Sequence, residues 1–421
     1  MRILFAFENA LPSAEADAEV FTSTARYLSR LVEGAALHVP FDRAADPAAI
    51  ATIAGLPVAR ARAPLKPAAL RHFACGLTIA RRLEFRAADL VYTRNLWVAW
   101  NALRAGQRVA FDHYRPWPDQ IPPLQPWLLR LMSHRRFLVH ICHSDYTRRT
   151  YLKLGVPPEK LVCIHNGFEP ARLAAPIPAA EAKAQLGIPP ERKTVVYTGR
   201  INHKKGLHLM VEAARRLPDL LFILVGSYGE GPIEAMARDV PNIRIVPFQP
   251  EAALAPYVFG ADVLMIPPSL QPLATFGSTV LPLKLFFYLA SGRPILAGET
   301  PEVREVLEHG RNAYLCPPDR IDALVEGLSR LTTDAALAAR LANAAEADSR
   351  SLTWASRATR IAALLERRLA AVPPAPVRWD RARSAGWRGQ SARWLLHLLR
   401  TRSWVMPPEI LPPAGARPSA E

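Results

Sequence analysis

Short apolar runs alternate with amphipathic stretches along most of the chain. The runs are RILFAF, ALHVP, DLVYT, RVAF, FLVHIC and LVCI in the first half, and TVVYT, LFILVG, NIRIVP, DVLMIP, RPILAG and NAYLC in the second. Runs of this length, rich in β-branched and aromatic residues, predict strands. The stretches between them are expected to form helices, as in AEVFTSTARYLSRLVEG, AALRHFACGLTIARRLEF and the stripe Leu207, Met210, Val211, Ala214 and Leu217.

The alternation of strands and helices predicts an α/β protein with parallel sheets covered by helices on both faces. Because the pattern occurs twice, and because 421 residues exceed a single core, we expect two Rossmann-like, doubly wound domains facing across a cleft. We assign them to residues 1–172 and 173–371. The remaining segment, 372–421, is a basic tail rich in proline and tryptophan.

Composition narrows the class of protein further. Half of the residues are hydrophobic and 21% are charged, which is typical of globular chains. The four cysteines lie far apart without a CxxC pair, which argues against a disulfide framework and a structural zinc site. The first apolar run is too short for a signal peptide, and prolines interrupt the charge-free run 263–283. We therefore expect a cytoplasmic protein.

The net charge of +16 is unevenly distributed, because the middle of the chain is nearly balanced while the first part and the tail are basic. Basic surfaces fit nucleic acid, an anionic membrane or an anionic small molecule. The sequence has no helix-turn-helix, zinc-finger or RNP-type motif, so nucleic acid is not among the expected partners.

One loop of the second half carries candidate chemistry. In YTGRINHKKGLHLMVEA a strand ends on Gly199 and Arg200, and Lys205 stands just before a helix. Two cations beside the free N–H groups of a helix start would bind a phosphate or diphosphate. A solvated basic turn is an equally good interpretation of the same spacing.

Six segments of the second half, in the same order, resemble the family-4 (group 1) retaining glycosyltransferases of the GT-B fold. They are HNGF at 165–168, VVYTGRINHKKGLHLMVEAARRL, LFILVGSYGEGPI, NIRIVPFQPEAALAPYVFGADVLMIPPS, PLKLFFYLASGRPIL and LTWASRATRIAALL. The resemblance is specific over about residues 160–370 and loose before them, and it leaves out the tail.

The resemblance implies donor-binding residues in the second half. Arg200 and Lys205 match the cations that hold the donor diphosphate, so they would stabilise the leaving group. Gly226 matches the glycine beside the nucleotide, although a plain strand-to-loop turn would also use glycine. Thr279 and Phe287 occupy the positions of two family glutamates, and Phe287 is the main departure because it cannot accept hydrogen bonds from ribose. Lys284 is either a phosphate contact or a solvent-facing helix residue.

The resemblance also implies residues in the first half and at the crossing between the domains. His113 lies one residue from the family's histidine near the acceptor, and is either functional or a satisfied structural histidine. The family's glycine-rich loop is replaced by ENALPSAEADAE, in which Ser13 still offers a hydroxyl. Asn166 and Gly167 match the family's turn between the domains, where glycine permits a positive φ.

The basic first half suggests an acceptor at a membrane. Arg71, Arg81, Arg82 and Arg86 fall on one expected helix, and PPLQPWLLRLMSHRR places Trp127, Leu128 and Leu131 beside arginines. Such segments are attracted to anionic lipid. The alternative is a proteome rich in arginine in which this charge has no function.

These observations favour a glycosyltransferase that moves a sugar from a nucleotide-sugar to a glycan or lipid-linked acceptor, with retention. It would need no cofactor or metal, because the chain lacks an Asp-x-Asp pair and the nucleotide-sugar is a co-substrate. The first alternative is a catalytically silent GT-B protein that binds a nucleotide-sugar or a partner enzyme. The second is another GT-B enzyme, a sugar-nucleotide epimerase or a phosphorylase.

Overall fold

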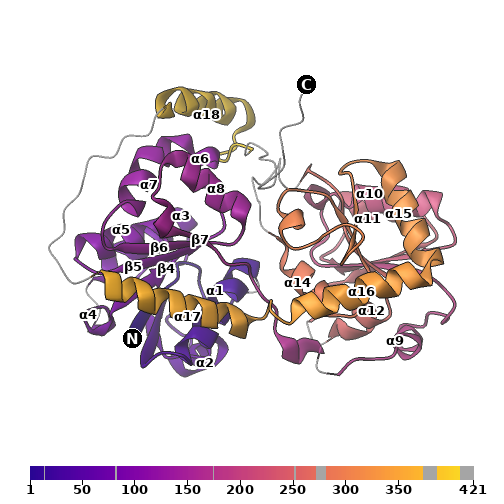
Figure 1. The fold of residues 1–421 in the computed structure, drawn as a ribbon, viewed down its shortest axis with the longest axis horizontal. Helices are drawn as coiled ribbons and strands as arrows, with labels where there is room; N and C mark the ends of the chain where they lie inside the picture. Colours follow the sequence, from indigo (N-terminus) through magenta and orange to yellow (C-terminus); the bar gives the residue numbers. More distant parts are fainter. Residues whose placement is uncertain are drawn as a thin grey trace. The chain divides into compact units, whose positions relative to one another are not determined.

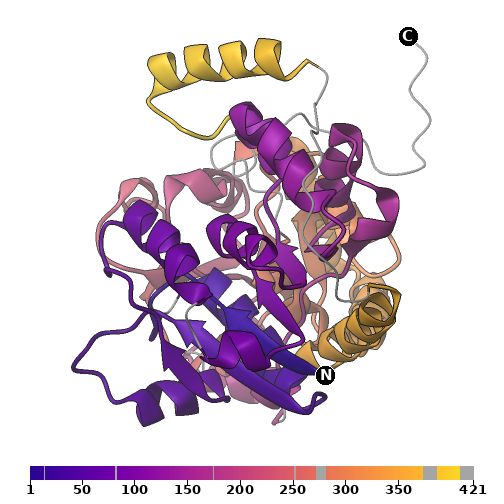
Figure 2. The ribbon, with the colours of Figure 1, turned by 90° about the vertical axis from the view of Figure 1, so that its left-hand side faces the viewer.

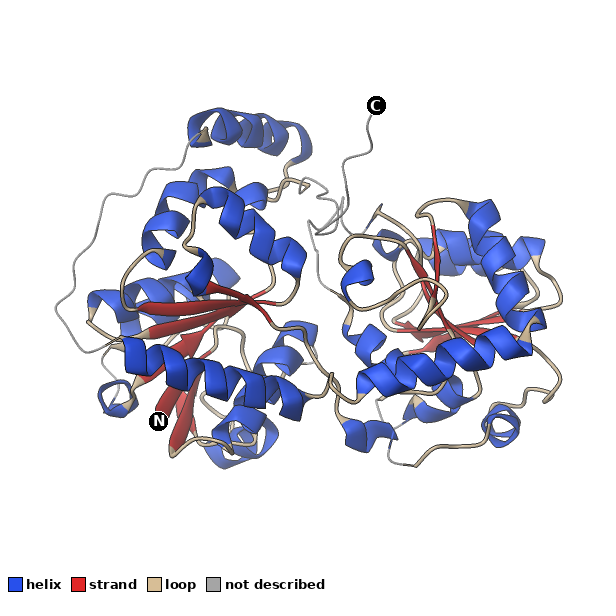
Figure 3. Cartoon of the chain, in the orientation of Figure 1, coloured by secondary structure: helices blue, strands red, loops and turns tan. Residues whose placement is uncertain are grey.

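The computed structural model describes residues 1–13, 15–80, 83–173, 175–250, 253–271, 281–372 and 386–407, and shows two compact α/β units. Residues 1–166 and 354–406 form the first unit, and residues 167–353 belong to the second (Figure 1). Every sheet strand is paired in parallel with its neighbours (Figure 3). The expectation of two Rossmann-like parallel-sheet domains is therefore confirmed.

The first unit contains a seven-stranded sheet in the order β3-β2-β1-β4-β5-β6-β7. Its strands are β1 (Arg2–Ala6), β2 (Gly34–Val39), β3 (Val58–Arg60), β4 (Leu90–Thr93), β5 (Val109–His113), β6 (Phe137–Cys142) and β7 (Leu161–Cys163). Its α-helices are α1 (Ala16–Ser29), α2 (Pro47–Ala54), α3 (Ala68–Ile79), α4 (Leu83–Ala87), α5 (Leu96–Arg104), α6 (Trp117–Gln120), α7 (Gln125–Met132), α8 (Asp145–Leu154), α17 (Trp354–Ala371) and α18 (Trp387–Thr401), and its 3₁₀ turns are η1 (Pro122–Leu124) and η2 (Pro158–Lys160).

The second unit contains a six-stranded sheet in the order β10-β9-β8-β11-β12-β13. Its strands are β8 (Thr194–Thr198), β9 (Leu221–Ser227), β10 (Ile243–Pro247), β11 (Val263–Ile266), β12 (Ile295–Gly298) and β13 (Tyr314–Cys316). Its α-helices are α9 (Ala179–Gln185), α10 (His208–Arg216), α11 (Pro232–Ala237), α12 (Ala255–Phe259), α14 (Leu283–Leu289), α15 (Ile321–Thr333) and α16 (Ala335–Ser349), and its 3₁₀ turns are η3 (Pro170–Leu173), η4 (His203–Lys205) and η6 (Val303–Glu305).

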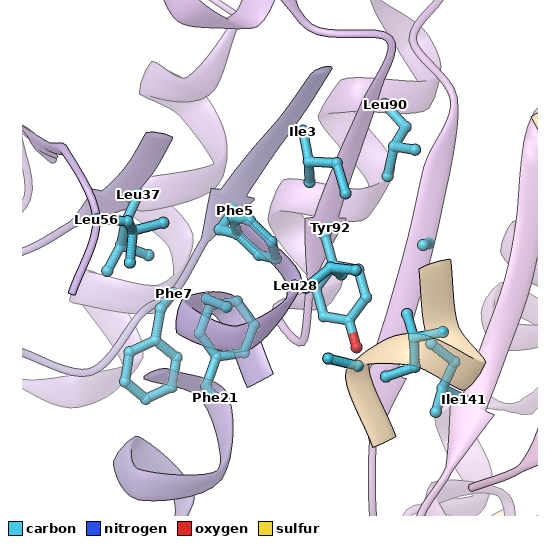
Figure 4. Packing of buried hydrophobic residues seen from close by; sticks show 14 of the residues in the cluster. Ile3, Phe5, Phe7, Phe21, Leu28, Leu37, Leu56, Leu90, Tyr92 and Ile141 are labelled. Carbon is cyan, nitrogen blue, oxygen red and sulfur yellow. The ribbon is translucent and has the colours of Figure 1, made fainter. Parts of the chain in front are cut away.

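The strands form because each presents apolar side chains to both faces of its sheet. In the first unit, Phe5 and Tyr92 of the neighbouring strands β1 and β4 pack against Phe21 of α1, and Phe21 stacks on Phe7 with ring centroids 4.8 Å apart (Figure 4). A second cluster fills the opposite face with residues of α3, α5 and α7. Such double-sided burial is what makes parallel strands near-continuous apolar runs.

Helix α17 belongs to the first unit, which differs from the expected boundary at residue 371. Ile361 and Leu365 are fully buried in the cluster that contains Phe21, and α17 packs along α1 (Figure 1). The chain thus returns to its first unit after the second is complete. The sequence pattern misplaced this helix because hydrophobic periodicity shows that a face is buried but not against which sheet it is buried.

One local expectation was also wrong, and one strand was not predicted. The stretch from Ala68 onward, expected to be one helix, contains α3 and the separate helix α4, and Arg81 and Arg82 lie outside the described residues. The three-residue strand β3 at the edge of the first sheet was not foreseen, since PVARAR carries no clear alternation. The other strands were all predicted.

Candidate functional site

Glycine is required twice where the loop after β8 approaches the end of β9, at Gly199 by its backbone conformation and at Gly226 by both its conformation and the close approach. Gly199 has a φ of 126°, and a Cβ added there would lie 2.6 Å from Nζ of Lys284. Gly226 has a φ of 123°, and its added Cβ would lie 2.5 Å from the carbonyl oxygen of Gly199. The amide of Gly199 also donates to the carbonyl of Val225, at 2.8 Å. These glycines therefore hold neighbouring strand ends together, at the sheet edge where α/β proteins bind ligands.

Lys205 ends the 3₁₀ turn η4 and is followed by Gly206, whose φ of 72° redirects the chain into α10. A Cβ at Gly206 would lie only 2.3 Å from Cβ of Ser269, so a larger residue would displace this turn. The structure thus places Lys205 just before α10, beside the helix start that the sequence predicts.

Three cations gather around the carboxyl end of β8. Burial and then Arg200 lower the pKa of Lys205, while burial and then Lys205 lower the pKa of Lys284 well below its usual range. The Lys284 ammonium lies 3.5 Å from the ring centroid of Tyr197, and the Arg200 guanidinium lies 5.3 Å from that of Tyr228. Both distances suit cation–π contacts. Lys284 is thus part of this cluster and does not face solvent as an isolated helix lysine.

No carboxylate among the described residues forms an ion pair with Arg200 or Lys284. Mutually repelling cations that are partly removed from water disfavour their own charged forms. An anion with more than one negative charge would relieve this repulsion, and a diphosphate suits a planar guanidinium together with two ammonium groups.

Of the two positions that match the family glutamates, only Phe287 lies within the described residues. Thr279 lies outside the described residues. Phe287 is on α14, where it is partly buried against the apolar cluster of the second sheet. Its ring supplies packing and no hydrogen-bond acceptor.

His113 ends β5 and is buried in an aromatic environment. Its ring lies 4.0 Å from that of Trp117 and 4.9 Å from that of Tyr114, and its Nδ1 accepts a hydrogen bond from the amide of Arg115. Burial first, and then Arg94 and Arg115, hold the pKa of His113 well below its usual value. The neutral ring therefore carries its proton on Nε2, which makes that nitrogen a hydrogen-bond donor.

Asp112, next to His113, joins a buried network that the sequence pattern did not predict. Nη2 of Arg357 on α17 donates to both carboxylate oxygens at 2.9 and 2.8 Å, and His143 and Tyr92 bond the same carboxylate. Burial alone would raise the pKa of Asp112, but Arg357 and His143 lower it well below the usual range. This network fixes α17 to the first sheet.

A second buried group of charges, Glu8 and Arg94, was also missed. Glu8 lies just beyond β1 and is 6% exposed, and Arg94 directly follows β4 and is 2% exposed. Burial raises the pKa of Glu8 to about 7, and Arg94 opposes that rise. A signal was present, because both residues are charged and lie one or two positions after a buried strand, as Arg200 does in the second half.

The turn at the crossing between the units is only partly as expected. Asn166 is buried, and its Oδ1 has no hydrogen-bond partner among the described residues. Gly167 is not among the glycines with positive φ, so that prediction was wrong. The division between the two units falls between these residues.

Four described residues that were expected to face a membrane are turned into the first unit, whereas Arg86 is exposed. Arg71 donates to the carbonyls of Glu8 and Leu65, and Leu128 and Leu131 are fully buried. Trp127 packs against the rings of Trp97 and Trp100. Among the described residues, no helix is both long and apolar enough to cross a bilayer.

Three exposed leucines of the tail lie instead on α18, which packs on η1 at the outside of the first unit (Figures 1 and 2). Leu395, Leu396 and Leu399 are 50%, 56% and 71% exposed. The chain folds back after the helix, where Trp394 Nε1 donates to the carbonyl of Trp404 at 2.8 Å. The three leucines do not take part in this hydrogen bond and remain exposed.

Two Rossmann-like units, each with a parallel sheet, form the architecture of the GT-B class of α/β proteins. Residues 18–172 match the family model "Glycosyltransferase Family 4", and residues 179–348 match "Glycosyl transferases group 1". Together the two models cover about three quarters of the chain. The chain belongs to the group 1 glycosyltransferase family.

Two curated relatives illustrate this membership. The putative colanic acid biosynthesis glycosyl transferase WcaI of Escherichia coli (strain K12) is 30% identical over 187 residues, which cover 42% of this chain and 45% of that protein. The amylovoran biosynthesis glycosyltransferase AmsK of Erwinia amylovora is 24% identical over 274 residues, covering 62% and 60%. The chain spans about half the length of the curated relatives it matches.

Solved structures share the fold. Anabaena Alr3699/HepE in complex with UDP has a TM-score of 0.70 at 18% identity, covering 87% of this chain and all of that one. Sucrose-phosphate synthase from Thermosynechococcus elongatus has a TM-score of 0.68 at 18% identity, with coverage of 88% and 100%. At these identities the likeness establishes the GT-B fold alone.

Proposed function

We propose that the protein is a glycosyltransferase that takes a sugar from a nucleotide-sugar donor. The observation that carries the proposal is the cluster of Arg200, Lys205 and Lys284 at the carboxyl end of β8. Relatives named as glycosyltransferases, and a structural neighbour solved with UDP-glucose, support the same reading.

In the proposed reaction the bond between the anomeric carbon and the diphosphate oxygen breaks, and a bond to an acceptor hydroxyl oxygen forms. The three cations stabilise the negative charge on the departing diphosphate. The acceptor proton passes to that diphosphate on the same face of the sugar, which gives retention. Because these side chains supply the positive charge, we propose that transfer needs no metal ion or cofactor.

A panel of UDP-, GDP-, ADP- and TDP-glucose tests the donor site by thermal shift. A donor at 100 times its Kd stabilises the native protein by roughly 2.7 kcal/mol. The variant Arg200→Ala/Lys205→Ala should lose that shift. The variant Arg238→Ala/Arg330→Ala, which removes the same charge from exposed positions just after α11 and in the last turn of α15, should keep it.

Two outcomes would contradict the proposal in different ways. A shift that survives in the Arg200→Ala/Lys205→Ala variant would place the nucleotide elsewhere. Binding without release of nucleoside diphosphate in any condition would favour a silent GT-B protein, with Phe287 in place of the family glutamate as the first cause to test.

We also propose that the acceptor is a glycan or lipid-linked molecule and that the protein docks on an anionic membrane surface from the cytoplasm. Two relatives carry names that refer to the biosynthesis of colanic acid and of amylovoran. The exposed leucines of α18 stand beside the exposed Arg393 and Arg400. An apolar face flanked by arginines suits the interface of an anionic bilayer.

Sedimentation with phosphatidylcholine vesicles, with and without phosphatidylglycerol, tests the docking. We expect preferential binding to the anionic vesicles, and loss of that binding in Leu396→Asp/Leu399→Asp. The control Leu31→Asp changes an exposed leucine elsewhere in the first unit and should bind as the native chain does. Equal binding to both kinds of vesicle would refute the docking.

A further inference from the structure

Two opposite charges are buried at neighbouring strand ends of the first sheet. Strands β1 and β4 pair in parallel with Ala6 opposite Thr93, so Glu8 and Arg94 emerge at the same edge. Arg94 is the charge that acts most strongly on Glu8. Nonetheless the two side chains form no ion pair, either with each other or with other described residues.

Each of these side chains has one buried atom without a hydrogen-bond partner in the described part of the chain, namely Oε2 of Glu8 and Nη2 of Arg94. The rest of Arg94 is firmly held. Its Nη1 donates to the carbonyl of Asp17 at 2.7 Å, and its guanidinium lies over the rings of Phe7 and Tyr114 at 5.9 and 5.3 Å. A buried donor and a buried acceptor left open in this way destabilise the fold unless another molecule satisfies them.

The charges around these two atoms restrict the chemistry of such a molecule. An anion would be repelled by Glu8 and by Asp17, which also acts on Glu8, and a cation would be repelled by Arg94 and Arg71. A neutral group that both donates and accepts a hydrogen bond suits the pair, because Glu8 offers an acceptor and Arg94 a donor. A hydroxyl group is the simplest such group.

We propose that Glu8 and Arg94 bind a hydroxyl group of a sugar or polyol acceptor, which donates to the carboxylate of Glu8 and accepts from the guanidinium of Arg94. The inference rests on the proposed function, since it gives the first unit the acceptor while the second takes the donor. In the free protein a water molecule would hold the same place.

The pKa of Glu8 gives the proposal a pH signature. With a pKa of about 7, set by burial and opposed by Arg94, Glu8 is mostly neutral at pH 6 and mostly ionised at pH 8. Of the other groups that face it, Asp17 raises this pKa and Arg71 lowers it. Because a hydroxyl bonds more strongly to a carboxylate than to a neutral acid, sugar affinity should rise between pH 6 and 8.

Saturation-transfer NMR with methyl α-D-glucopyranoside, methyl β-D-galactopyranoside, methyl α-D-mannopyranoside and myo-inositol tests the site directly. We expect the native protein to bind at least one of these probes. Glu8→Gln and Arg94→Lys should each weaken that binding at least tenfold, and Glu8→Gln should also abolish its pH dependence. The matched controls Glu15→Gln and Arg104→Lys, both exposed, should bind like the native chain.

Two outcomes would overturn this inference while leaving the proposal for the donor site unaffected. If the native protein binds none of the four probes, or if both variants bind as it does, Glu8 and Arg94 are not a hydroxyl site. The nucleotide panel reports on the second unit independently, so a failure of the proposed function would appear there. Tryptophan emission monitors folding of the variants, because all nine tryptophans lie outside the second unit's residues 167–353.

Discussion

The buried charges of the two units differ in how completely they are compensated. In the first unit, Asp112 is bonded by Arg357, His143 and Tyr92, and the carboxylate and guanidinium neutralise each other. In the second unit, Arg200 and Lys284 lie near Lys205, and each of the two contacts a tyrosine ring. The first arrangement is closed, while the second leaves positive charge for an incoming group.

This difference separates structural from ligand-binding charges. A buried pair with satisfied hydrogen bonds holds parts of the fold together, whereas uncompensated charge reduces stability and is retained where a ligand compensates it. Glu8 and Arg94 fall between the two cases, since they are opposite in sign but each keeps an open atom. Substitutions at these sites should therefore have effects of opposite sign on stability.

The largest effect is expected for Asp112→Asn. It leaves the Arg357 guanidinium buried without its counter-charge, so the first unit should lose about 3–5 kcal/mol of its free energy of unfolding. Because the folded-state pKa of Asp112 is lowered, its stabilisation is complete at pH 7 and disappears as the pH falls below its ordinary value. Urea unfolding followed by tryptophan emission measures the loss.

The matched control is Glu33→Gln, which removes the partner of the amino terminus in a surface ion pair with a side chain 74% exposed. Exposed pairs contribute about 0–1 kcal/mol. An Asp112→Asn variant no less stable than this control would show that the buried network does not anchor α17.

The next effect, Glu8→Gln, should have the opposite sign. The pKa of the Glu8 carboxyl rises from 4.5 to about 7 on folding. The folded protein therefore loses stability as the pH rises from 4.5 to 7, because the unfolded chain releases this proton at a lower pH. The variant should therefore be more stable than the native chain at pH 8, by roughly 1–3 kcal/mol, and about equal to it at pH 4. A variant that is less stable at pH 8 would place Glu8 with Asp112 among the structural charges.

The smallest effect is expected for Lys284→Met in the second unit. Loss of one charged contact to the diphosphate should weaken nucleotide-sugar binding about tenfold, while removal of a desolvated cation should raise the melting temperature of the free protein. Isothermal titration calorimetry and thermal unfolding measure the two changes. Arg238→Met, at an exposed position, should alter neither, and unchanged affinity in Lys284→Met would exclude Lys284 from the donor site.

Local pattern was sufficient for most of the fold and for part of the site. The parallel strands from Thr194 to Cys316 were predicted because strands buried on both faces must be continuous apolar runs. Gly199, Arg200 and Lys205 were recognisable because a strand end, a glycine and a helix start lie within a few residues of one another.

The rest depends on contacts between residues distant in the sequence. Glu8 meets Arg94 only because β1 and β4 are neighbours in the sheet, and Arg357 reaches Asp112 only because α17 returns to the first unit. Arg71 was expected at the surface, but its side chain points into the first unit because it donates a hydrogen bond to the carbonyl of the distant residue Glu8.

The sequence by itself therefore determined the class of fold, the strands and the cationic loop after β8, because hydrophobic periodicity and turn chemistry act over short distances. The tertiary structure alone decided which charges are paired and which remain open. Pairing depends on which strand ends and helices become neighbours, and on how far water is excluded from them, and neither is encoded in local spacing.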